Sequence, residues 1–259
     1  MAFINYKIKG EGPPVIFIHG FCETREIWDS FINKISNDFQ VITPDLPGFG
    51  LSKLTNTNST LQEIGNDLNE WVLKQGFENS ILMGHSLGGY ISLAMVDQMP
   101  SLYSAFGLIH STSKADTDEK KLNRNKVMAF VKEHGVSAFV DSFVPGLFYQ
   151  KNHPSIDLVH KIALKTPEST FFSYTSAMRD RPSNEKLVAN YTKPILLVGG
   201  EKDTVIAIDS LREQAALNDL VTFHSLPEVG HMGMFEASPE LEIIVYNFLS
   251  NVSKGRLRQ

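Results

Sequence analysis

The sequence has little cysteine: Cys22 is the one cysteine in 259 residues. A single thiol cannot form a disulfide within the chain, so nothing here requires an oxidising compartment. The sequence also lacks any run of about 18 consecutive apolar residues, which a membrane-spanning helix needs. Its N-terminus, Met1–Gly10, lacks the basic stretch and long apolar run of a signal peptide. These absences predict a cytoplasmic protein with no membrane partner.

Positive charge is scarce as well. The chain has 24 lysines and arginines against 29 aspartates and glutamates, and its formal net charge is -5. Binding to nucleic acid needs concentrated positive charge, so this balance argues against a nucleic-acid partner. With 42% hydrophobic and 20% charged residues, the composition is typical of a soluble globular protein. A chain of this length commonly forms one α/β domain, and its oligomeric state cannot be read from the sequence.

Short apolar runs recur along the chain, most of them next to a glycine, proline or histidine. Such runs are typical of strands that are buried on both faces of a parallel sheet. They are Val15–Ile18, Val41–Ile42, Ile81–Met83, Ala105–Ile109 and Ile195–Val198. Phe3–Ile8 and Val221–Leu226 alternate more between apolar and polar residues, which predicts strands nearer the edges of the sheet.

Helical patterns lie between these runs. Apolar residues recur at steps of three and four in two segments, which predicts that each forms a helix with one buried face. They are Leu61, Ile64, Leu68, Trp71 and Val72, and then Leu241, Ile244, Val245, Phe248 and Leu249. We expect Ser238 to cap the second helix and Pro239 to occupy its first turn. Strands that alternate with helices predict an α/β fold with helices on both faces of a mostly parallel sheet.

The alternation is interrupted between residues 111 and 192. This stretch is rich in helix-forming and aromatic residues but has no clear buried strand. We therefore expect a core domain made of residues 1–110 and 193–259, with a helical insertion at residues 111–192. Most of the aromatic side chains should pack the insertion onto the sheet, and a few should face the space beneath it.

The strongest local signal is Gly84-His-Ser-Leu-Gly88, which follows the strand-like Ile81–Met83 and precedes a helical pattern at Tyr90–Val96. That context is typical of a nucleophile elbow, where a sharp turn between strand and helix exposes a serine. The strained turn needs small neighbours, which the glycines supply, and the helix start offers N–H donors to an oxyanion. The alternative is a glycine-rich turn without chemistry, while the spacings of phosphate-binding loops are absent. The motif predicts Ser86 as a nucleophile.

With these features the chain resembles the α/β-hydrolase family over nearly its whole length. His19-Gly-Phe21 matches the family's His-Gly-x motif, and the resemblance implies that the backbone N–H groups of Phe21 and Leu87 form an oxyanion hole. Asp45–Ser52 resembles a structural loop of the family with the pattern Asp-x-x-Gly-x-Gly-x-Ser. The resemblance also implies a helical cap over the active site, inserted after the sixth strand, and here the insertion follows Ile109.

The family's catalytic order is serine, then acid, then histidine, and the resemblance assigns the acid to Asp203 in a Gly-x-x-Asp pattern. The carboxylate of such an acid holds the histidine in one tautomer and stabilises it once protonated. Glu201 lies too close to the strand end and is the lesser candidate. A minority arrangement places the acid after the sixth strand, where Asp116 and Asp118 lie. The plainer alternative for Asp203 is to cap a helix that begins near Val205.

His231 lies in a loop before the final helix, where the family keeps its base. A loop position lets the imidazole reach Ser86 without being buried in the sheet. The side chain of His85 should point away from that of Ser86, and His19 should be a hydrogen-bonded structural residue. His110 ends a strand near the active face and is a candidate for lining the pocket. No histidines have a compact ligand spacing such as His-x-x-x-His, so the sequence predicts no metal site.

The resemblance implies a serine hydrolase that cleaves a small carboxylic ester, lactone or thioester through an acyl-enzyme on Ser86. His231 and Asp203 would complete a Ser-His-Asp triad, and no cofactor is required. The small-molecule substrate should be an apolar or aryl ester, given the aromatic residues of the cap. Arg179 or Arg181 is a candidate for binding a carboxylate substrate, although a solvated or salt-bridged surface arginine is the simpler interpretation.

Other activities share this scaffold. A serine nucleophile argues against haloalkane dehalogenases and epoxide hydrolases, which attack through a carboxylate. C–C bond hydrolysis, enol-lactone hydrolysis and cofactor-free perhydrolysis stay open. So does a ligand receptor or signalling protein that has kept the triad but hydrolyses slowly, because fold alone does not fix function.

Overall fold

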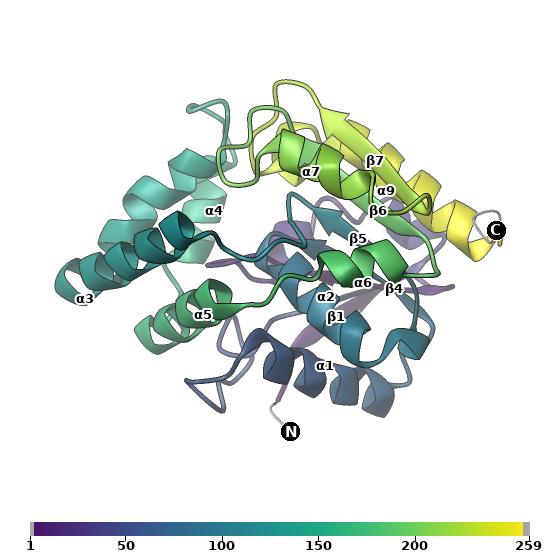
Figure 1. Ribbon diagram of the computed structural model, residues 1–259, viewed down its shortest axis with the longest axis horizontal. Coiled ribbons are helices and arrows are strands. Elements are labelled where there is room, and N and C mark those ends of the chain that lie inside the picture. Colours follow the sequence, from purple (N-terminus) through teal and green to yellow (C-terminus); the bar gives the residue numbers. More distant parts are fainter. Residues whose placement is uncertain (1–2, 256–259) are drawn as a thin grey trace.

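The computed structural model describes residues 3–255, and within this range seven strands form one sheet in the order β1-β3-β2-β4-β5-β6-β7 (Figure 1). At one edge β1 pairs antiparallel with β3, and all other neighbouring strands are parallel. The strands are β1 (Tyr6–Lys9), β2 (Pro14–Ile18), β3 (Gln40–Pro44), β4 (Ser80–His85), β5 (Tyr103–Ile109), β6 (Ile195–Gly200) and β7 (Val221–Leu226). The mostly parallel α/β sheet is therefore confirmed, and the two strands expected near the edges lie there.

The strands of the central sheet are buried on both faces. In β2, Val15 and Phe17 belong to one hydrophobic cluster, while Ile16 and Ile18 belong to a second cluster on the opposite face. Successive side chains of a strand point to opposite faces, so an apolar run without alternation is what a doubly covered strand requires. All four side chains are fully buried, and each contributes about 1.5–3 kcal/mol through burial.

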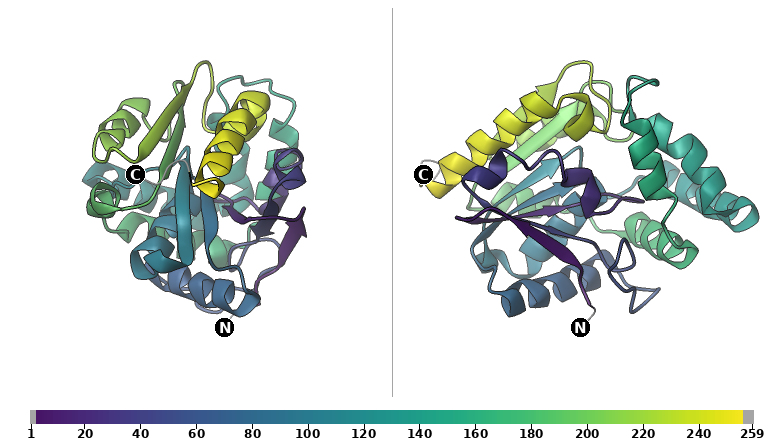
Figure 2. Two further views of the ribbon diagram at one scale, coloured as in Figure 1. Left: turned by 90° about the vertical axis from the view of Figure 1, so that its right-hand side faces the viewer. Right: turned by 180° about the vertical axis from the view of Figure 1, so that it is seen from behind.

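Helices cover the two faces (Figure 2). One face is covered by α1 (Leu61–Gln75), α2 (Leu87–Gln98) and α7 (Ile208–Ala215). The other is covered by α9 (Ser238–Ser253) and two short helices, η1 (Arg25–Trp28) and η2 (Ile35–Asn37). In α1 all five apolar residues that predict the helix are buried, and in α9 all are buried except Ile244, which is half-buried. The short helix η3 (Pro100–Leu102) precedes β5.

The predicted cap of α9 is wrong. Ser238 is the first residue inside the helix and its side chain makes no capping hydrogen bond, while Pro239 does lie in the first turn. The reason is a short preceding helix, α8 (Gly233–Glu236), which ends one residue before α9. The N–H of Ala237 therefore bonds to the carbonyl oxygen of Gly233, and Ala237 itself, with a φ of -139° and a ψ of 45°, is the non-helical residue that precedes α9.

Between β5 and β6 the described residues form helices and no strand: α3 (Asp118–Leu147), α4 (Ile156–Ala163), α5 (Glu168–Asp180) and α6 (Glu185–Asn190). The first three gather beyond the end of the sheet, whereas α6 lies back along it (Figure 1). α3 is bent at Gly135, whose φ of 80° and ψ of 166° are not helical. The helical segment follows Ile109, as expected. It comes after the fifth strand of the described chain, however, whereas the resemblance implies an insertion after the sixth.

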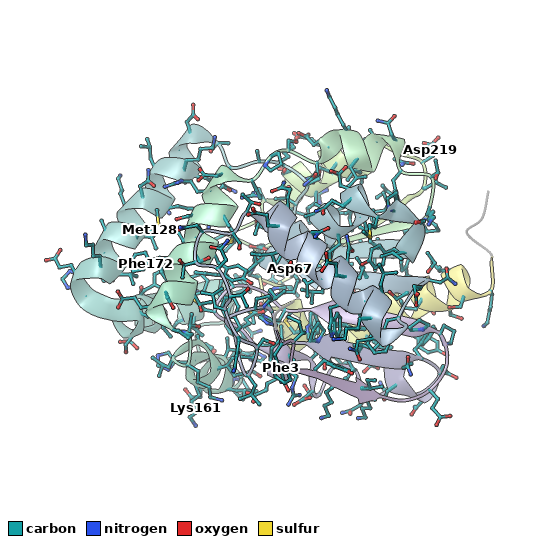
Figure 3. All side chains as sticks on the ribbon, turned by 90° about the horizontal axis from the view of Figure 1, so that it is seen from below. Phe3, Asp67, Met128, Lys161, Phe172 and Asp219 are labelled. Atoms are coloured by element: carbon teal, nitrogen blue, oxygen red, sulfur yellow. The ribbon has the colours of Figure 1, made fainter. Side chains whose placement is uncertain are left out.

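α3 and α5 pack against each other, and Met128 on α3 lies near Phe172 on α5 in the view from below (Figure 3). α5 is joined to the loop Asp45–Ser52 of the core. Tyr174 OH donates to Pro47 O at 2.9 Å and Thr170 Oγ1 donates to Gly48 O at 3.0 Å. Gly48 has a φ of 88°, and a Cβ there would collide with Thr170, so only glycine allows this approach.

The loop Asp45–Ser52 is held by its own aspartate, as the sequence predicts for a structural loop. The carboxylate of Asp45 accepts from the backbone N–H groups of Arg25 and Leu51 and from Asn5 Nδ2, at 2.7–3.1 Å.

No helix among residues 3–255 has the length and apolar character needed to cross a membrane.

Candidate active site

Ser86 lies at a sharp turn between β4 and α2. Its φ of 49° and ψ of -114° place it in a region that residues with a Cβ rarely adopt. Hydrogen bonds hold the turn: Ser86 N–H donates to Ile109 O at 3.0 Å, and Ser86 O accepts from Ser111 Oγ at 2.7 Å. Ser86 is half-buried, while His85 and Leu87 on either side are fully buried. The predicted nucleophile therefore has the backbone conformation of an elbow.

The glycines of the motif make the turn possible. A Cβ at Gly84 would collide with the backbone of Gly88 and Gly89, and a Cβ at Gly88 would collide with the carbonyl oxygen of Ile18. A Cβ at Gly89 would collide with the side chain of Ser111. These contacts explain why the chain needs small residues on both sides of Ser86 and confirm the steric reason inferred from the sequence.

His231 and Asp203 are in direct contact. His231 Nδ1 donates to Asp203 Oδ2 at 2.8 Å, and both side chains are buried. The other carboxylate oxygen, Oδ1, accepts from the backbone N–H groups of Val205 and Ile206 at 2.8 and 3.0 Å. Asp203 thus fixes one face of the imidazole and also organises the following turn, although the next helix begins only at Ile208.

The structure strongly stabilises the ionised form of Asp203. Burial alone would raise the pKa of this carboxyl, but attraction to His231, the hydrogen bond from the His231 ring and the nearby ring of His110 hold it well below its usual range. A carboxylate that stays ionised can keep the Nδ1 proton on His231 and leave Nε2 to act as a base. This is the arrangement that the chemistry of a triad needs from its acid.

The other candidate acids have different partners. Asp116 is buried and accepts from Arg181 Nη1 at 2.7 Å and from Arg124 Nε. Asp118 is exposed at the start of α3. Glu201 is exposed and accepts from Ser225 Oγ at 3.0 Å. Of the acids considered in the sequence, Asp203 is the one that the structure brings to His231.

Arg181 and Arg179 are both salt-bridged. Arg181 is buried, which corrects the expectation of a surface residue, and its guanidinium lies 4.0 Å from the centre of the Tyr90 ring. Its burial follows from the buried carboxylate of Asp116, which needs a cationic partner. Arg179 pairs with Asp180 at 2.7 Å and lies nearer the surface.

His110 is a third member of this cluster. Its Nδ1 lies 3.4 Å from Asp203 Oδ2, the same oxygen that His231 contacts, and burial lowers the pKa of His110 to about 4. The ring is therefore neutral near pH 7. His110, Asp203 and His231 offer three possible metal-ligand atoms within 4.8 Å of one another. Because Asp203 and His231 already satisfy each other, these atoms serve an acid–base pair better than a cation.

A buried ion pair underlies the site. His85 Nδ1 lies 3.0 Å from Glu23 Oε2, and His85 Nε2 lies 3.0 Å from the carbonyl oxygen of His231. Both neighbours are acceptors, so only a protonated ring donates to both. Burial alone would lower the pKa of His85, but the charge of Glu23 and its hydrogen bond outweigh burial and raise that pKa. Glu23 Oε2 also accepts from the N–H of Gly20.

The pair therefore joins three parts of the site: the loop after β2, the elbow and the backbone of His231. Sequence reasoning missed Glu23, because nothing in its spacing distinguishes it from a surface glutamate. The expectation that His85 points away from Ser86 agrees with its bonds to Glu23 and His231. His19 is a structural residue as expected, since its Nε2 accepts from Leu46 N–H at 3.0 Å.

The predicted oxyanion residues flank the elbow. Leu87 is the first residue of α2, and the first N–H groups of a helix have no partner within the helix. Phe21 lies three residues after β2, beside Cys22, whose φ of 57° turns the chain sharply. The Phe21 ring packs against Phe171 of α5, with 5.2 Å between ring centres. The loop after β2 is thus in contact with α5.

Comparison with known proteins agrees with this geometry. Residues 13–140 match the family model of the alpha/beta hydrolase fold. The chain has the α/β-hydrolase fold. A thermophilic esterase from Thermogutta terrifontis superposes on this hydrolase with a TM-score of 0.91 at 25% identity, over 97% of this chain and 94% of that chain. An enol-lactonase from Burkholderia xenovorans LB400 superposes with a TM-score of 0.88 at 18% identity, over 96% and 97% of the two chains.

A curated relative extends the comparison to sequence. The 2-(acetamidomethylene)succinate hydrolase of Mesorhizobium japonicum is 24% identical over 261 residues, which cover 95% of this chain and 91% of that protein. The names of this relative and of the Thermogutta esterase describe hydrolases. The family-model match and these relatives support hydrolase activity for this chain.

The Glu23–His85 pair predicts a pH-dependent stability of the hydrolase. The pKa of His85 is raised above 6.5. The contribution of protonated His85 to the free energy of unfolding is therefore complete below pH 6.5 and is lost as the pH rises through the folded-state pKa. Burial alone would raise the pKa of Glu23, but His85 lowers it below 4.5, so that contribution is complete above pH 4.5 and is lost in stronger acid. We expect Glu23→Gln to lower the free energy of unfolding by about 3 kcal/mol inside this window.

Urea unfolding over a range of pH measures this cost. In alkaline solution, above the folded-state pKa of His85, the cost of Glu23→Gln should shrink because the native ring is then neutral. Glu26→Gln is the matched control, since the Glu26 side chain is 42% exposed and pairs only at 3.5 Å with Lys165; its cost should stay within about 0.5 kcal/mol. A cost of Glu23→Gln that is the same at pH 5.5 and in alkali would contradict a protonated His85.

Proposed function

We propose that this hydrolase cleaves small carboxylic esters, with lactones and thioesters as related substrates, through a covalent acyl-enzyme on Ser86. His231 is the general base, Asp203 orients it, and the N–H groups of Phe21 and Leu87 hold the oxyanion. The observation that carries the proposal is the 2.8 Å hydrogen bond from His231 Nδ1 to a buried, ionised Asp203. The elbow conformation of Ser86 supports it independently.

In the first step Ser86 Oγ attacks the ester carbonyl and its proton passes to His231 Nε2. The carbonyl oxygen becomes an oxyanion, which two backbone N–H donors stabilise; losing one such donor typically costs about 10²–10³ in rate. The C–O bond to the alcohol then breaks, and the alcohol leaves with the proton that His231 has held. The acyl group stays on Ser86 as an ester.

In the second step a water molecule attacks the acyl-enzyme. His231 Nε2 takes a proton from the water and returns it to Ser86 Oγ as that oxygen leaves, so the carboxylic acid is released and the resting enzyme is restored. The substrate and one water supply every atom of the products, so the scheme requires no cofactor.

The domain boundaries and the cellular location of the protein stay predictions. Residues 1–110 and 193–259 would form the core domain, and residues 111–192 the cap that covers Ser86. The aromatic residues of α3 that face Phe21, with ring centres 6.3–6.5 Å apart, support a cap that receives apolar or aryl groups. We retain the prediction of a cytoplasmic location.

A fluorophosphonate probe tests the proposal directly, because it reacts only with a serine that a neighbouring base activates. We expect one probe adduct, on the peptide that contains Ser86, and loss of labelling in His231→Gln. Ser210→Ala, which removes a hydroxyl on α7 away from the elbow, is the control and should label as the wild type does. Absence of any adduct on Ser86 would overturn the assignment of the nucleophile.

The rival activities give different results in turnover assays. A receptor that has kept the triad would label at Ser86 but would turn over aryl esters, thioesters and lactones with negligible rates. C–C cleavage or perhydrolysis would add activity on diketones or with hydrogen peroxide beyond that on esters. Turnover of esters at rates well above those of the other classes supports the proposed function.

A further inference from the structure

A cavity of about 300 Å³ lies between the cap helices and the core. Its core wall includes Phe21, Tyr90 and Ile206. Each of these residues belongs to the surroundings of one proposed catalytic group: Phe21 is a proposed oxyanion donor, Tyr90 lies one helical turn after Ser86, and Ile206 follows Asp203 by three residues. The cavity therefore borders the surroundings of the proposed catalytic groups, although Ser86 and His231 are not part of its lining. We take a group that fills it to be attached to the carbonyl under attack.

One part of the lining is apolar. Phe139 and Phe143 of α3 pack edge-to-face with Phe21 in the lining of the cavity. Val127 lies on the same helix, before the bend at Gly135. The two α3 rings stack on each other with 4.7 Å between their centres. This wall is suited to bind a hydrocarbon group, because removing apolar surface from water stabilises binding.

The other part of the lining is charged. Asp116, Lys120 and Arg124 line it, from the start of α3 and the loop before it. The one carboxylate among these described residues, that of Asp116, is shared by two guanidinium groups, Arg124 and Arg181. Lys120 adds a third cation, whose Nζ reaches only the carbonyl oxygen of Val205, at 3.3 Å.

Positive charge is therefore in excess at this end of the cavity. Asp203 also lies close enough to act on the charge of Lys120, but its oxygens are taken by His231 and by backbone N–H groups. A neutral alkyl group placed here would remove water from Lys120 and Arg124 without offering either of them an acceptor. A carboxylate would accept hydrogen bonds from both, and such charge-assisted bonds are the stronger ones.

We propose that the cavity binds an acyl group that ends in a carboxylate, so that the preferred substrate is a monoester of a dicarboxylic acid with a hydrocarbon spacer. The spacer packs on Phe139 and Phe143, and the free carboxylate pairs with Lys120 and Arg124. This assignment rests on the proposed function in one respect: it takes Ser86 to be the residue that attacks the ester end.

Matched aryl esters test the charge preference. 4-Nitrophenyl hydrogen adipate and 4-nitrophenyl 6-methylheptanoate have acyl groups of nearly the same shape, with a carboxylate in one where the other has an isopropyl group. We expect the wild type to favour the anionic ester in kcat/KM by about 10-fold or more, because charged hydrogen bonds are involved. Lys120→Met should lower this ratio about 10-fold, and high salt should lower it in the wild type.

Lys126→Met is the matched control, since Lys126 lies on α3 but not in the lining of the cavity; it should keep the wild-type ratio. The suberate monoester and its isopropyl counterpart repeat the comparison with a longer spacer. A wild type that favours the neutral ester of both pairs, or a ratio unchanged in Lys120→Met, overturns the carboxylate site.

A binding measurement separates this inference from the proposed reaction. Calorimetric titration of the Ser86→Ala protein with monomethyl adipate needs no chemistry at Ser86. Binding that weakens about 10-fold in the Lys120→Met background supports the site even if Ser86 is never labelled, in which case the proposed function fails alone. Labelling of Ser86 with no binding and no charge preference leaves the proposed function standing and overturns the carboxylate site.

Discussion

Ser86→Ala is expected to lower kcat for 4-nitrophenyl ester hydrolysis by about 10⁶-fold, the loss typical of removing the nucleophile of a triad. In the proposed mechanism no acyl-enzyme forms without Oγ, and His231 could assist only a direct attack by water. KM should change little, because the methyl side chain leaves the cavity between cap and core intact. Initial rates over a range of ester concentration measure both constants.

Ser92→Ala is the control for that variant. Ser92 lies on the same helix and its hydroxyl donates to Gly88 O at 2.8 Å, so its loss affects packing near the elbow without touching the proposed chemistry. Its kcat should stay within a few-fold of the wild type. If Ser86→Ala kept a tenth or more of the wild-type kcat while its thermal unfolding matched the wild type, another nucleophile would have to be sought.

Asp203→Asn is expected to lower kcat by about 10⁴-fold with the fold preserved. The carboxamide has nearly the shape of the carboxylate, and its oxygen can still accept from Val205 and Ile206. Its NH₂ group, however, would face His231 Nδ1 as a donor, which favours the tautomer with the proton on Nε2. That tautomer cannot take a proton from Ser86, and the positive charge that forms on His231 would lose its counter-charge.

Glu201→Gln separates the two acids at the end of β6. Glu201 is exposed and bonded to Ser225, so the same chemical change there should leave kcat within about two-fold, as expected for a surface site. Steady-state rates of both variants on one aryl ester give the comparison. Equal losses in the two variants, or a small loss in Asp203→Asn, would contradict the assignment of Asp203.

The fold could be predicted from the sequence because its main signals are local. Val15–Ile18 is apolar at every position, and a strand covered on both faces imposes that pattern on the chain itself. The same holds for Leu61, Ile64 and Leu68, whose spacing is that of the buried face of α1. Ser238 misled the prediction because a capping sequence was considered without the helix α8 that ends just before it.

The site was predictable only in part. Asp203 and His231 were assigned through resemblance to a family, and no spacing rule joins residues 28 positions apart. Glu23 and His85 are 62 positions apart, and a buried glutamate has the same letter as an exposed one. The directions of Phe139 and Phe143 depend on the bend at Gly135 and on the packing of the cap, which periodicity does not encode.

His231, the proposed base, is hydrogen-bonded to the end of α3 as well as to Asp203. His231 N–H donates to Leu147 O at the end of α3 at 2.7 Å. The carboxylate of Glu236 accepts from Tyr149 N–H and from the N–H groups of Gly230 and Met232, at 2.7–3.1 Å. It follows that the segment between β5 and β6 cannot be exchanged simply to change which ester is bound. Trimming it, or grafting another segment in its place, would also displace His231 and so disturb the proposed proton transfer.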